Sequence, residues 1–443
     1  MPVAERQSTY VTAFEALRGS ADAGPDWLRE AREAAFGRFL EHGFPTTRDE
    51  EWRHTNVKPI ADTTFELAAS LTLSRDILAP ASFDEDAAAE IVVVNGRVSQ
   101  TLSSLQALPR GVTVRSARES WPAPRVEPPA GEAASAPAGP RVATATAFTD
   151  LNLAFFEDAI VIHVDPKTIV PSPIHVLFVS VAGAAPAMAS PRLLLEAGEQ
   201  SQISIIESYV GVGEGVTLAN AVTEFRIDAG AVVNHVKIQR ELATAFHVAH
   251  MLARLGRSAN LVSHAISLGG RIARNDIVAV LDGEGAECVL NGLYVADGDT
   301  LIDTHTTIDH AKPHCPSHEL YKGILDGRSR AVFNGKIIVR PDAQKTDAKQ
   351  TNKALLLTDD AQINTKPQLE IFADDVKCTH GAAIGQLDDD QMFYLRSRGI
   401  PELDARNLLI HAFANDVLTG MKIEGVRDRV MHWLEEKLRL PAA

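Results

Sequence analysis

The chain has 443 residues, of which 45% are apolar and 23% charged, as expected for a globular protein with two or three structural units. Its formal net charge of −15, from 43 basic and 58 acidic side chains, argues against a nucleic-acid scaffold. No apolar run is long enough to span a bilayer, the N-terminus lacks the apolar core of a signal peptide, and the three cysteines have no CxxC spacing. These features predict a cytoplasmic protein without a disulfide framework or a self-contained zinc or cluster site.

The N-terminal region is expected to be helical, because apolar residues recur there at helical spacing. A second helix is predicted from about Asp26 to Gly43, which is a natural C-cap. Thr47 and Glu50 have the spacing of a capping box. For Trp52, which follows closely, packing is the preferred interpretation over any role in binding a ligand.

A short strand is predicted at 91–94, followed by the turn pair Asn95-Gly96. Residues 121–140 contain so much Pro, Ala and Gly, with so little else that is apolar, that they predict a linker. A further helix is expected from Ala147 to Ala159. The first structural unit is therefore predicted to comprise residues 1–150.

From residue 160 to residue 387, short apolar runs alternate with tight corners rich in Gly, Asp and Ser. Small residues are expected at equivalent corners, namely Ala231, Ala259, Ala286 and Ala361, and the first three lie 28 and 27 residues apart. Such a period indicates a solenoid, and strand-like runs without a helical pattern indicate a parallel β-helix. This core is predicted to span residues 151–390.

The last segment, 391–443, again shows helical periodicity. One amphipathic stripe comprises Leu408, Leu409, Ala412, Phe413 and Val417. A final helix is predicted from about Glu424, with an apolar stripe of Val426, Val430, Trp433, Leu434 and Leu438. Because the last coil of a β-helix exposes unpaired backbone, these helices are expected to cover it.

Sequence motifs of several enzyme classes are absent: there is no GxxxxGK[ST], GxGxxG, GxSxG or HExxH. The densest group of titratable residues runs from Asp303 to Glu319. It contains five nitrogen or sulfur donors, His305, His310, His314, Cys315 and His318. Side-chain ladders inside a β-helix are the preferred interpretation of this group, because spacing without geometry is a weak indication of a metal site.

Cys378 and His380 are stronger candidates for binding a metal. They lie two residues apart, so that in a strand both side chains point to one face. A thiolate and an imidazole are donors that suit iron. Packing in the core is the alternative, and it fits Cys378 better than His380.

The segments KPQLEI, ADDVKC, HGA and FYLRSRGI within 366–400, together with DGRSRAVFNGKI (326–337), resemble the SufD branch of the SufB/SufD family. These are proteins of iron–sulfur cluster assembly. The resemblance implies a right-handed parallel β-helix flanked by helical segments. It also implies a non-catalytic scaffold subunit that pairs with SufB and docks the SufC ATPase. Whether the chain forms a homodimer when alone stays open at this point.

The resemblance further implies the roles of particular residues. The histidine of the KCTH pattern, His380, is expected to bind iron or a transient Fe–S cluster shared with SufB, with Cys378 as a weaker candidate. The segment Phe393–Leu418 is expected to dock the ATPase. Its predicted contact residues are Arg396, Arg398, Leu408, Leu409 and Phe413.

Two alternatives stay open. A SufB-like scaffold would share the fold, although the absence of a cysteine after Cys378 favours the SufD branch. A β-helix enzyme acting on carbohydrates would need paired carboxylates on one outer face. The Asp and Glu residues are expected in turns rather than in alternating strand positions, and this placement argues against such an enzyme.

Overall fold

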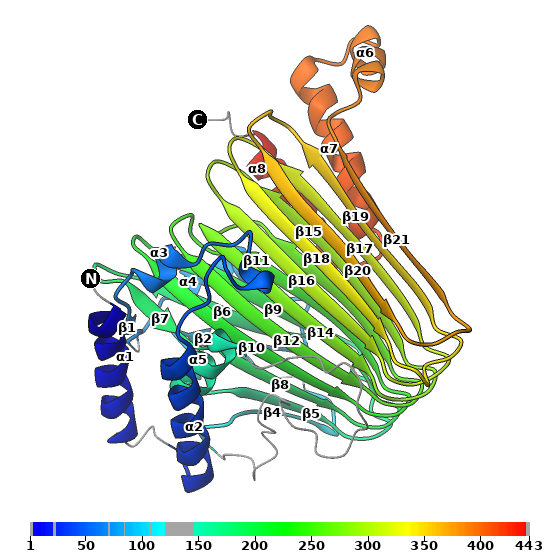
Figure 1. Cartoon of the computed structure of the whole chain (residues 1–443). Coiled ribbons are helices and arrows are strands. Elements are labelled where there is room, and N and C mark those ends of the chain that lie inside the picture. The colour runs from blue at the N-terminus through cyan, green and yellow to red at the C-terminus, as the bar shows by residue number, and fades with distance from the viewer. Residues whose placement is uncertain are drawn as a thin grey trace.

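The computed structural model describes residues 3–20, 24–69, 71–83, 85–105, 108–119 and 146–439. Its centre is a parallel β-solenoid of about eight turns with helices at the N- and C-terminal ends of the chain, so the predicted fold class is confirmed (Figure 1). The predicted linker at 121–140 lies outside the described residues. The predicted unit boundaries at residues 150 and 390 stay predictions.

Two sheets face each other across the solenoid, and the chain alternates between them. The first sheet contains β1 (Glu66–Leu67), β4 (Val112–Ser116), β5 (Ile160–Val164), β7 (Ala187–Ala189), β8 (Arg192–Ala197), β10 (Thr217–Ile227), β12 (Phe246–Leu255), β14 (Ile272–Leu281), β16 (Leu301–His310), β18 (Arg330–Val339) and β20 (Gln362–Ile371). The second contains β2 (Ala89–Val94), β3 (Arg97–Val98), β6 (Ile174–Ala182), β9 (Gln202–Gly213), β11 (Val232–Arg240), β13 (Asn260–Ser267), β15 (Glu287–Ala296), β17 (Pro316–Leu325), β19 (Asp347–Leu356) and β21 (Lys377–Gly385). Within the described ranges these strands pair in parallel, except β2 with β3 and β4 with β5.

Three of the four predicted corners are equivalent. Ala231, Ala259 and Ala286 are fully buried and directly precede β11, β13 and β15 of the second sheet. Ala361 precedes β20 of the first sheet, so its assignment to the same column was wrong; Cys315 takes the next position in that column, before β17. Both corners of a turn accept small residues, so size alone does not say which corner a residue occupies.

Most N-terminal helices pack on the outer face of the first sheet (Figure 1), whereas the short helices that contain Leu78 and Ala81 pack on strands β2 and β6 of the second sheet. The described helices of this region are α1 (Val3–Arg18), α2 (Asp26–His42), η2 (Glu50–Trp52), α3 (Lys58–Ala61), α4 (Arg75–Leu78), η3 (Ala79–Ala81) and α5 (Ala147–Phe155). The helix ending at Gly43 is confirmed, with a C-cap φ of 67°. The predicted capping box was wrong: the Asp49 carboxylate accepts from the Thr46 backbone N–H at 2.6 Å instead.

At the other end of the chain, α6 (Asp389–Ser397), α7 (Glu402–Leu418) and α8 (Glu424–Arg439) follow the last strand. Helices α7 and α8 bury their apolar faces on the outer face of the second sheet, against residues such as Ile238 and Leu293. They do not cover the last coil, so that expectation was wrong. The outer face of the second sheet is itself apolar. It gives the apolar stripes of both helices a larger surface to pack on than the end of the solenoid does.

The rotation of α7 also differs from the prediction. Its buried residues are Ala405, Ile410, Ala414, Val417 and Leu418, whereas Leu408 is 52% exposed. In α8 the predicted stripe is confirmed, because Val426, Val430, Trp433 and Leu434 are all buried. Within the described ranges, every helix is too short or too polar to cross a membrane.

Candidate functional site

The last turn of the solenoid is open. Strand β20 pairs with β18, and β21 pairs with β19, and no described strand pairs with the other edge of either. Figure 1 shows these two strands, coloured gold and orange, at the far end of the solenoid from the N-terminal helices. An unpaired strand edge presents free N–H and C=O groups, and it is a template for pairing with another chain. We refer to β20 and β21 together as the open end.

Both predicted metal-binding residues lie on the inward face of β21. Cys378 is in register with Ala348, and His380 with Gln350. Ala348 and Gln350 are both buried inside the solenoid, and residues in register on neighbouring strands point the same way. The two side chains therefore share one face, as their spacing predicts.

The surroundings of these two side chains differ. Cys378 is half-buried and packs against the cluster that contains Ile337 and Val339, and burial raises the pKa of its thiol. His380 is exposed, because no turn among the described residues follows to cover it. The thiol is thus placed as a core residue, whereas the imidazole stands at the rim.

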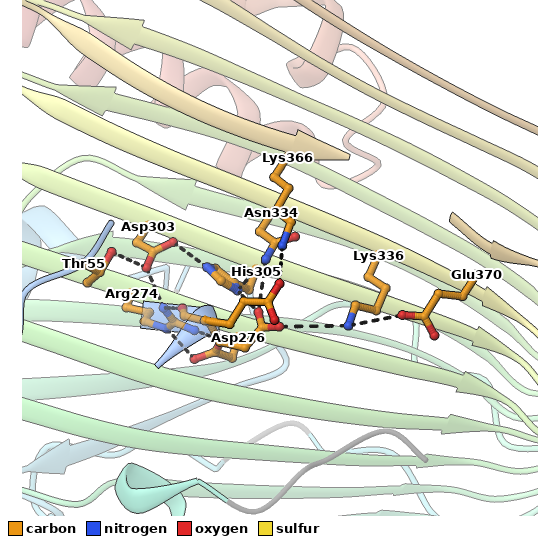
Figure 2. Close-up of polar contacts among 11 residues, drawn as sticks. Thr55, Arg274, Asp276, Asp303, His305, Asn334, Lys336, Lys366 and Glu370 are labelled. Atoms are coloured by element: carbon orange, nitrogen blue, oxygen red, sulfur yellow. Dashed lines mark hydrogen bonds and ion pairs between the residues drawn. The ribbon is translucent and has the colours of Figure 1, made fainter. Parts of the chain in front are cut away.

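A second group of polar residues, the Arg274 cluster, lies on the outer face of the first sheet (Figure 2). We define it as Arg274, Asp303 and His305 of the solenoid together with Glu51 and Thr55 of the N-terminal segment. Arg274 donates to Asp303 and to the backbone carbonyl of Glu51, both at 2.7 Å. Thr55 donates to Asp303 at 2.6 Å.

The remaining contacts give every charged group of the cluster an oppositely charged neighbour. His305 lies 3.0 Å from Asp303 through Nε2 and 3.1 Å from Glu51 through Nδ1. Arg274 also donates twice to Asp276, and its guanidinium carbon lies 3.7 Å from the centre of the Trp52 ring. These contacts hold the segment that carries Glu51 and Trp52 against the outer face of the first sheet, which agrees with the packing interpretation of Trp52.

The charges in the cluster stabilise one another. Burial disfavours a charged His305, but the neighbouring Asp303 and Glu51 carboxylates outweigh it, and the pKa of His305 is raised to about 9. Burial also opposes ionisation of Asp303, yet Arg274 and His305 hold the pKa of its carboxyl well below the usual range. The cluster is therefore an ionised, mutually neutralising group at neutral pH.

Open clefts flank the N-terminal segment on both sides. One has a volume of about 1040 Å³ and reaches from Arg38 and Phe44 to His250 and Lys336. The other, of about 590 Å³, lies between His54 and Asn364. Acidic groups outnumber basic groups in the lining of the first cleft, and the two kinds are nearly balanced in the second, so neither cleft is a strongly basic site for an anionic ligand.

The predicted His/Cys group between residues 303 and 319 does not converge. His305 belongs to the Arg274 cluster, His310 bonds to Ser317 at 2.9 Å, and Cys315 occupies a buried corner. His314 lies in a turn, with φ 61°. Across the ranges that the structure describes, no three or more His, Cys, Asp or Glu side chains come close enough to hold a metal ion.

The residues expected to dock an ATPase lie on two helices. Arg396 and Arg398 are exposed on and directly after α6, where Arg396 pairs with Glu402 at 3.3 Å. On α7, Leu408 is exposed, while Leu409 and Phe413 are half-buried. The Phe413 ring lies 4.5 Å from the ammonium of Lys322, so it packs on the solenoid.

The expectation that the carboxylates sit in turns was wrong for several of them. Glu207, Asp276, Asp303 and Glu319 lie in strands β9, β14, β16 and β17. Neighbouring coils of the solenoid supply the groups that pair with these carboxylates. Glu207, for example, lies 3.0 Å from His235 of the next strand in its sheet. On the outer face, Asp276 and Asp303 are both bound by Arg274, so they do not form the free carboxylate pair that a glycoside-cleaving enzyme needs.

Comparison with known proteins gives a consistent result. The family model "SUF system FeS cluster assembly, SufBD core domain" matches residues 178–413, and the model "SufBD protein N-terminal region" matches residues 4–176. The chain is 34% identical over 396 residues to an iron–sulfur cluster assembly SufBD family protein of Synechocystis, covering 87% of this chain and 86% of the relative. It is 31% identical over 405 residues to the iron–sulfur cluster assembly protein SufD of Escherichia coli, covering 90% of each. It is 28% identical over 428 residues to the chloroplastic protein ABCI7 of Arabidopsis thaliana, covering 94% of this chain and 88% of the relative.

Proposed function

The chain belongs to the SufB/SufD family of iron–sulfur cluster assembly proteins, and we propose that it acts there as a non-catalytic scaffold subunit in the cytoplasm. Through its open end it pairs with a SufB-like scaffold, and through its helical tail it docks a SufC-like ATPase. The observation that carries this proposal is the uncovered last turn, which presents the inward-facing His380 at its rim.

The open end is suited to pairing with another strand-rich chain. Its two edges leave backbone groups unpaired, and several large apolar side chains are exposed there: Ile371 is 40% exposed, Phe372 51% and Ile384 50%. A partner that adds its own strands would satisfy the backbone and cover this apolar surface together. A second copy of the chain is the occupant expected when no SufB-like partner is present.

His380 is proposed to bind the iron or nascent cluster that the complex assembles. An iron–sulfur cluster needs about four protein ligands at its irons, so one imidazole is not sufficient. The missing ligands must therefore come from the partner, with Cys378 as a weaker contributor from this chain. The iron and the cluster are cargo in this scheme, and they are held only in the assembled complex.

The helical tail is proposed as the docking surface for the ATPase. Helix α6 stands clear of the sheets in Figure 1, and it exposes Phe393 by 75% and Tyr394 by 56%. An exposed aromatic pair next to the basic side chains Arg396 and Arg398 is typical of a protein–protein contact. Leu408 extends the apolar part of this surface onto α7.

The role of His380 is tested by His380→Ala in the assembled complex. We expect the complex to form normally but to carry several-fold less cluster, measured from its visible absorption after anaerobic purification. Thr379→Ala is the matched control, because Thr379 is an exposed neighbour on the opposite face of β21. A normal cluster yield in the His380 variant would refute the role of this residue.

The docking surface is tested by Arg398→Glu and Leu408→Asp, both at exposed positions. Each is expected to reduce co-purification of the ATPase without changing the unfolding transition of the chain. Phe413→Asp is expected to do the same, but its half-buried ring makes it a weaker test. Arg328→Glu, an exposed arginine on a solenoid turn, is the control. Undiminished co-purification from the two folded variants would exclude this surface.

A further inference from the structure

An inward-facing column of polar side chains lies directly behind His380. Strands β17, β19 and β21 are successive members of the second sheet. In their register Glu319 pairs with Gln350, and Gln350 pairs with His380. Glu319 and Gln350 are only 3% and 1% exposed. The three side chains therefore follow one another from the interior of the solenoid to its rim.

The two ends of the Gln350 amide are used differently. Its Nε2–H donates to the Glu319 carboxylate at 2.7 Å, which commits the nitrogen to the turn before. Its buried Oε1 has no hydrogen-bond donor among the described residues. With the nitrogen committed to Glu319, the oxygen is the end of the amide that is left without a partner. A buried carbonyl oxygen without a donor is destabilising, so a native structure normally provides one.

Space for this amide is built into the opposite sheet. Gly335 of β18 lies against it, and a Cβ at that position would stand 2.1 Å from Gln350 Nε2. A glycine is therefore required there for the amide to take its position. On the turn after Gln350, the residue in register is His380, whose ring has N–H groups to donate.

We infer that Gln350 is a positioning residue for His380. Its side-chain oxygen accepts a hydrogen bond from one ring nitrogen of His380, which leaves the lone pair of the other nitrogen directed at iron. Glu319 holds the Gln350 amide in this orientation. The inference rests on the proposed function of His380 and deepens it, because it says which group fixes the tautomer and the orientation of the ring.

General metal-site chemistry supports this arrangement. A histidine that binds a metal usually donates its other ring N–H to a carbonyl or carboxylate oxygen, which fixes both the tautomer and the orientation of the ring. An exposed histidine without such an acceptor is free to rotate and to exchange between tautomers. The Glu319–Gln350 pair supplies such an acceptor on the turn that precedes His380.

The inference is tested by nitrogen-15 NMR of the histidine rings in the full-length chain. In the wild type we expect one neutral tautomer of His380 to dominate, and in Gln350→Met, which removes the acceptor at nearly constant volume, both tautomers to be populated. Asn352→Leu is the matched control. It also removes a buried inward amide of β19, one that bonds to Thr365 and Tyr294 and not to the Glu319 column.

Two further variants keep the test decisive. Glu319→Gln retains an oxygen that accepts from the Gln350 amide and should preserve the single tautomer, whereas Glu319→Leu releases the amide and should mix the tautomers as Gln350→Met does. In the assembled complex, Gln350→Met should lower the iron content by about 10-fold, a typical effect of losing such a partner. An unchanged tautomer ratio in a folded Gln350→Met variant would overturn the inference.

The outcomes separate this inference from the proposed function. A mixed His380 tautomer in Gln350→Met, together with a normal cluster yield in His380→Ala, would support the contact but refute the role of His380 in assembly. An unchanged tautomer, together with loss of the cluster in His380→Ala, would refute the contact and leave the proposed function intact.

Discussion

The Arg274 cluster and the open end both present a histidine on a strand of the solenoid, yet their environments are opposite. His305 has both ring nitrogens close to a carboxylate, and its side chain is only 11% exposed. His380 is exposed at the rim, and the groups behind it include an oxygen without a donor. Where titratable side chains are most numerous, they neutralise one another and fix the N-terminal segment. The candidate site lies instead at the open end, where the edges of β20 and β21 have no paired strand among the described residues.

The largest expected effect follows from removing the central cation of the cluster. Arg274→Met leaves Asp303 buried without its main counter-charge, and we expect a loss of about 3 to 5 kcal/mol in the free energy of unfolding. Urea unfolding measures this loss. Arg328→Met is the control, because it removes an exposed ion pair, with Asp299, and should leave stability unchanged. Equal effects in the two variants would contradict a structural role for the cluster.

The second prediction concerns alkaline pH. The pKa of His305 is raised from 6.5 to about 9 in the folded chain, so its stabilising contribution is complete below pH 6.5 and is lost as pH rises through 9. The difference in unfolding free energy between wild type and His305→Asn should therefore shrink by about 2 to 3 kcal/mol across this interval. Glu319 titrates near pH 7 in both proteins and cancels in the difference.

The control for this pH series is His432→Asn, which alters an exposed histidine of α8. Its difference from wild type should stay flat over the same interval. If the His305→Asn difference were equally flat, the histidine would not be held in its charged form by Asp303 and Glu51.

At the open end the expected effect on stability is small. Ile384→Asp places a charge on an inward-facing but half-exposed position of β21, and the free energy of unfolding should change by less than about 0.5 kcal/mol. The same change at Ile308, which is fully buried in β16, should cost several kcal/mol because the new charge is unpaired. Comparable losses in Ile384→Asp and Ile308→Asp would mean that the open end is covered in solution.

The smallest effect is expected where the two regions meet. Lys366 of β20 pairs with Glu50 of the N-terminal segment at 2.8 Å, but both side chains are largely exposed. Lys366→Met should leave the urea midpoint unchanged within error, since exposed ion pairs add little to stability. A clear shift would show that this contact couples the N-terminal segment to the last turn.

Sequence patterns were sufficient for several features of the fold. The C-cap at Gly43 and the stripe of α8 were predicted because each depends on local conformation or helical period alone. The shared face of Cys378 and His380 followed from the period of two in a strand. In α7 the predicted stripe was rotated, because the outer face of the second sheet decides which side of a partly apolar helix is buried.

Other features could not be obtained from sequence reasoning. The Arg274 cluster joins residues more than 200 positions apart, as in the bond from Arg274 to the Glu51 carbonyl, and no local pattern marks such a pair. Gln350 gives no signal of its own either. It becomes informative only when the register places it between Glu319 and His380.

The sequence by itself determined that the chain is a coiled ribbon of strands with helical ends, because strand alternation, corner residues and helical period are local properties. Only the tertiary structure decided that helices α7 and α8 lie along the second sheet and leave the last turn open. It also decided which histidine is buried among carboxylates and which one stands at the rim. Both outcomes depend on which surfaces of the folded chain contact each other, and a local sequence pattern does not specify those contacts.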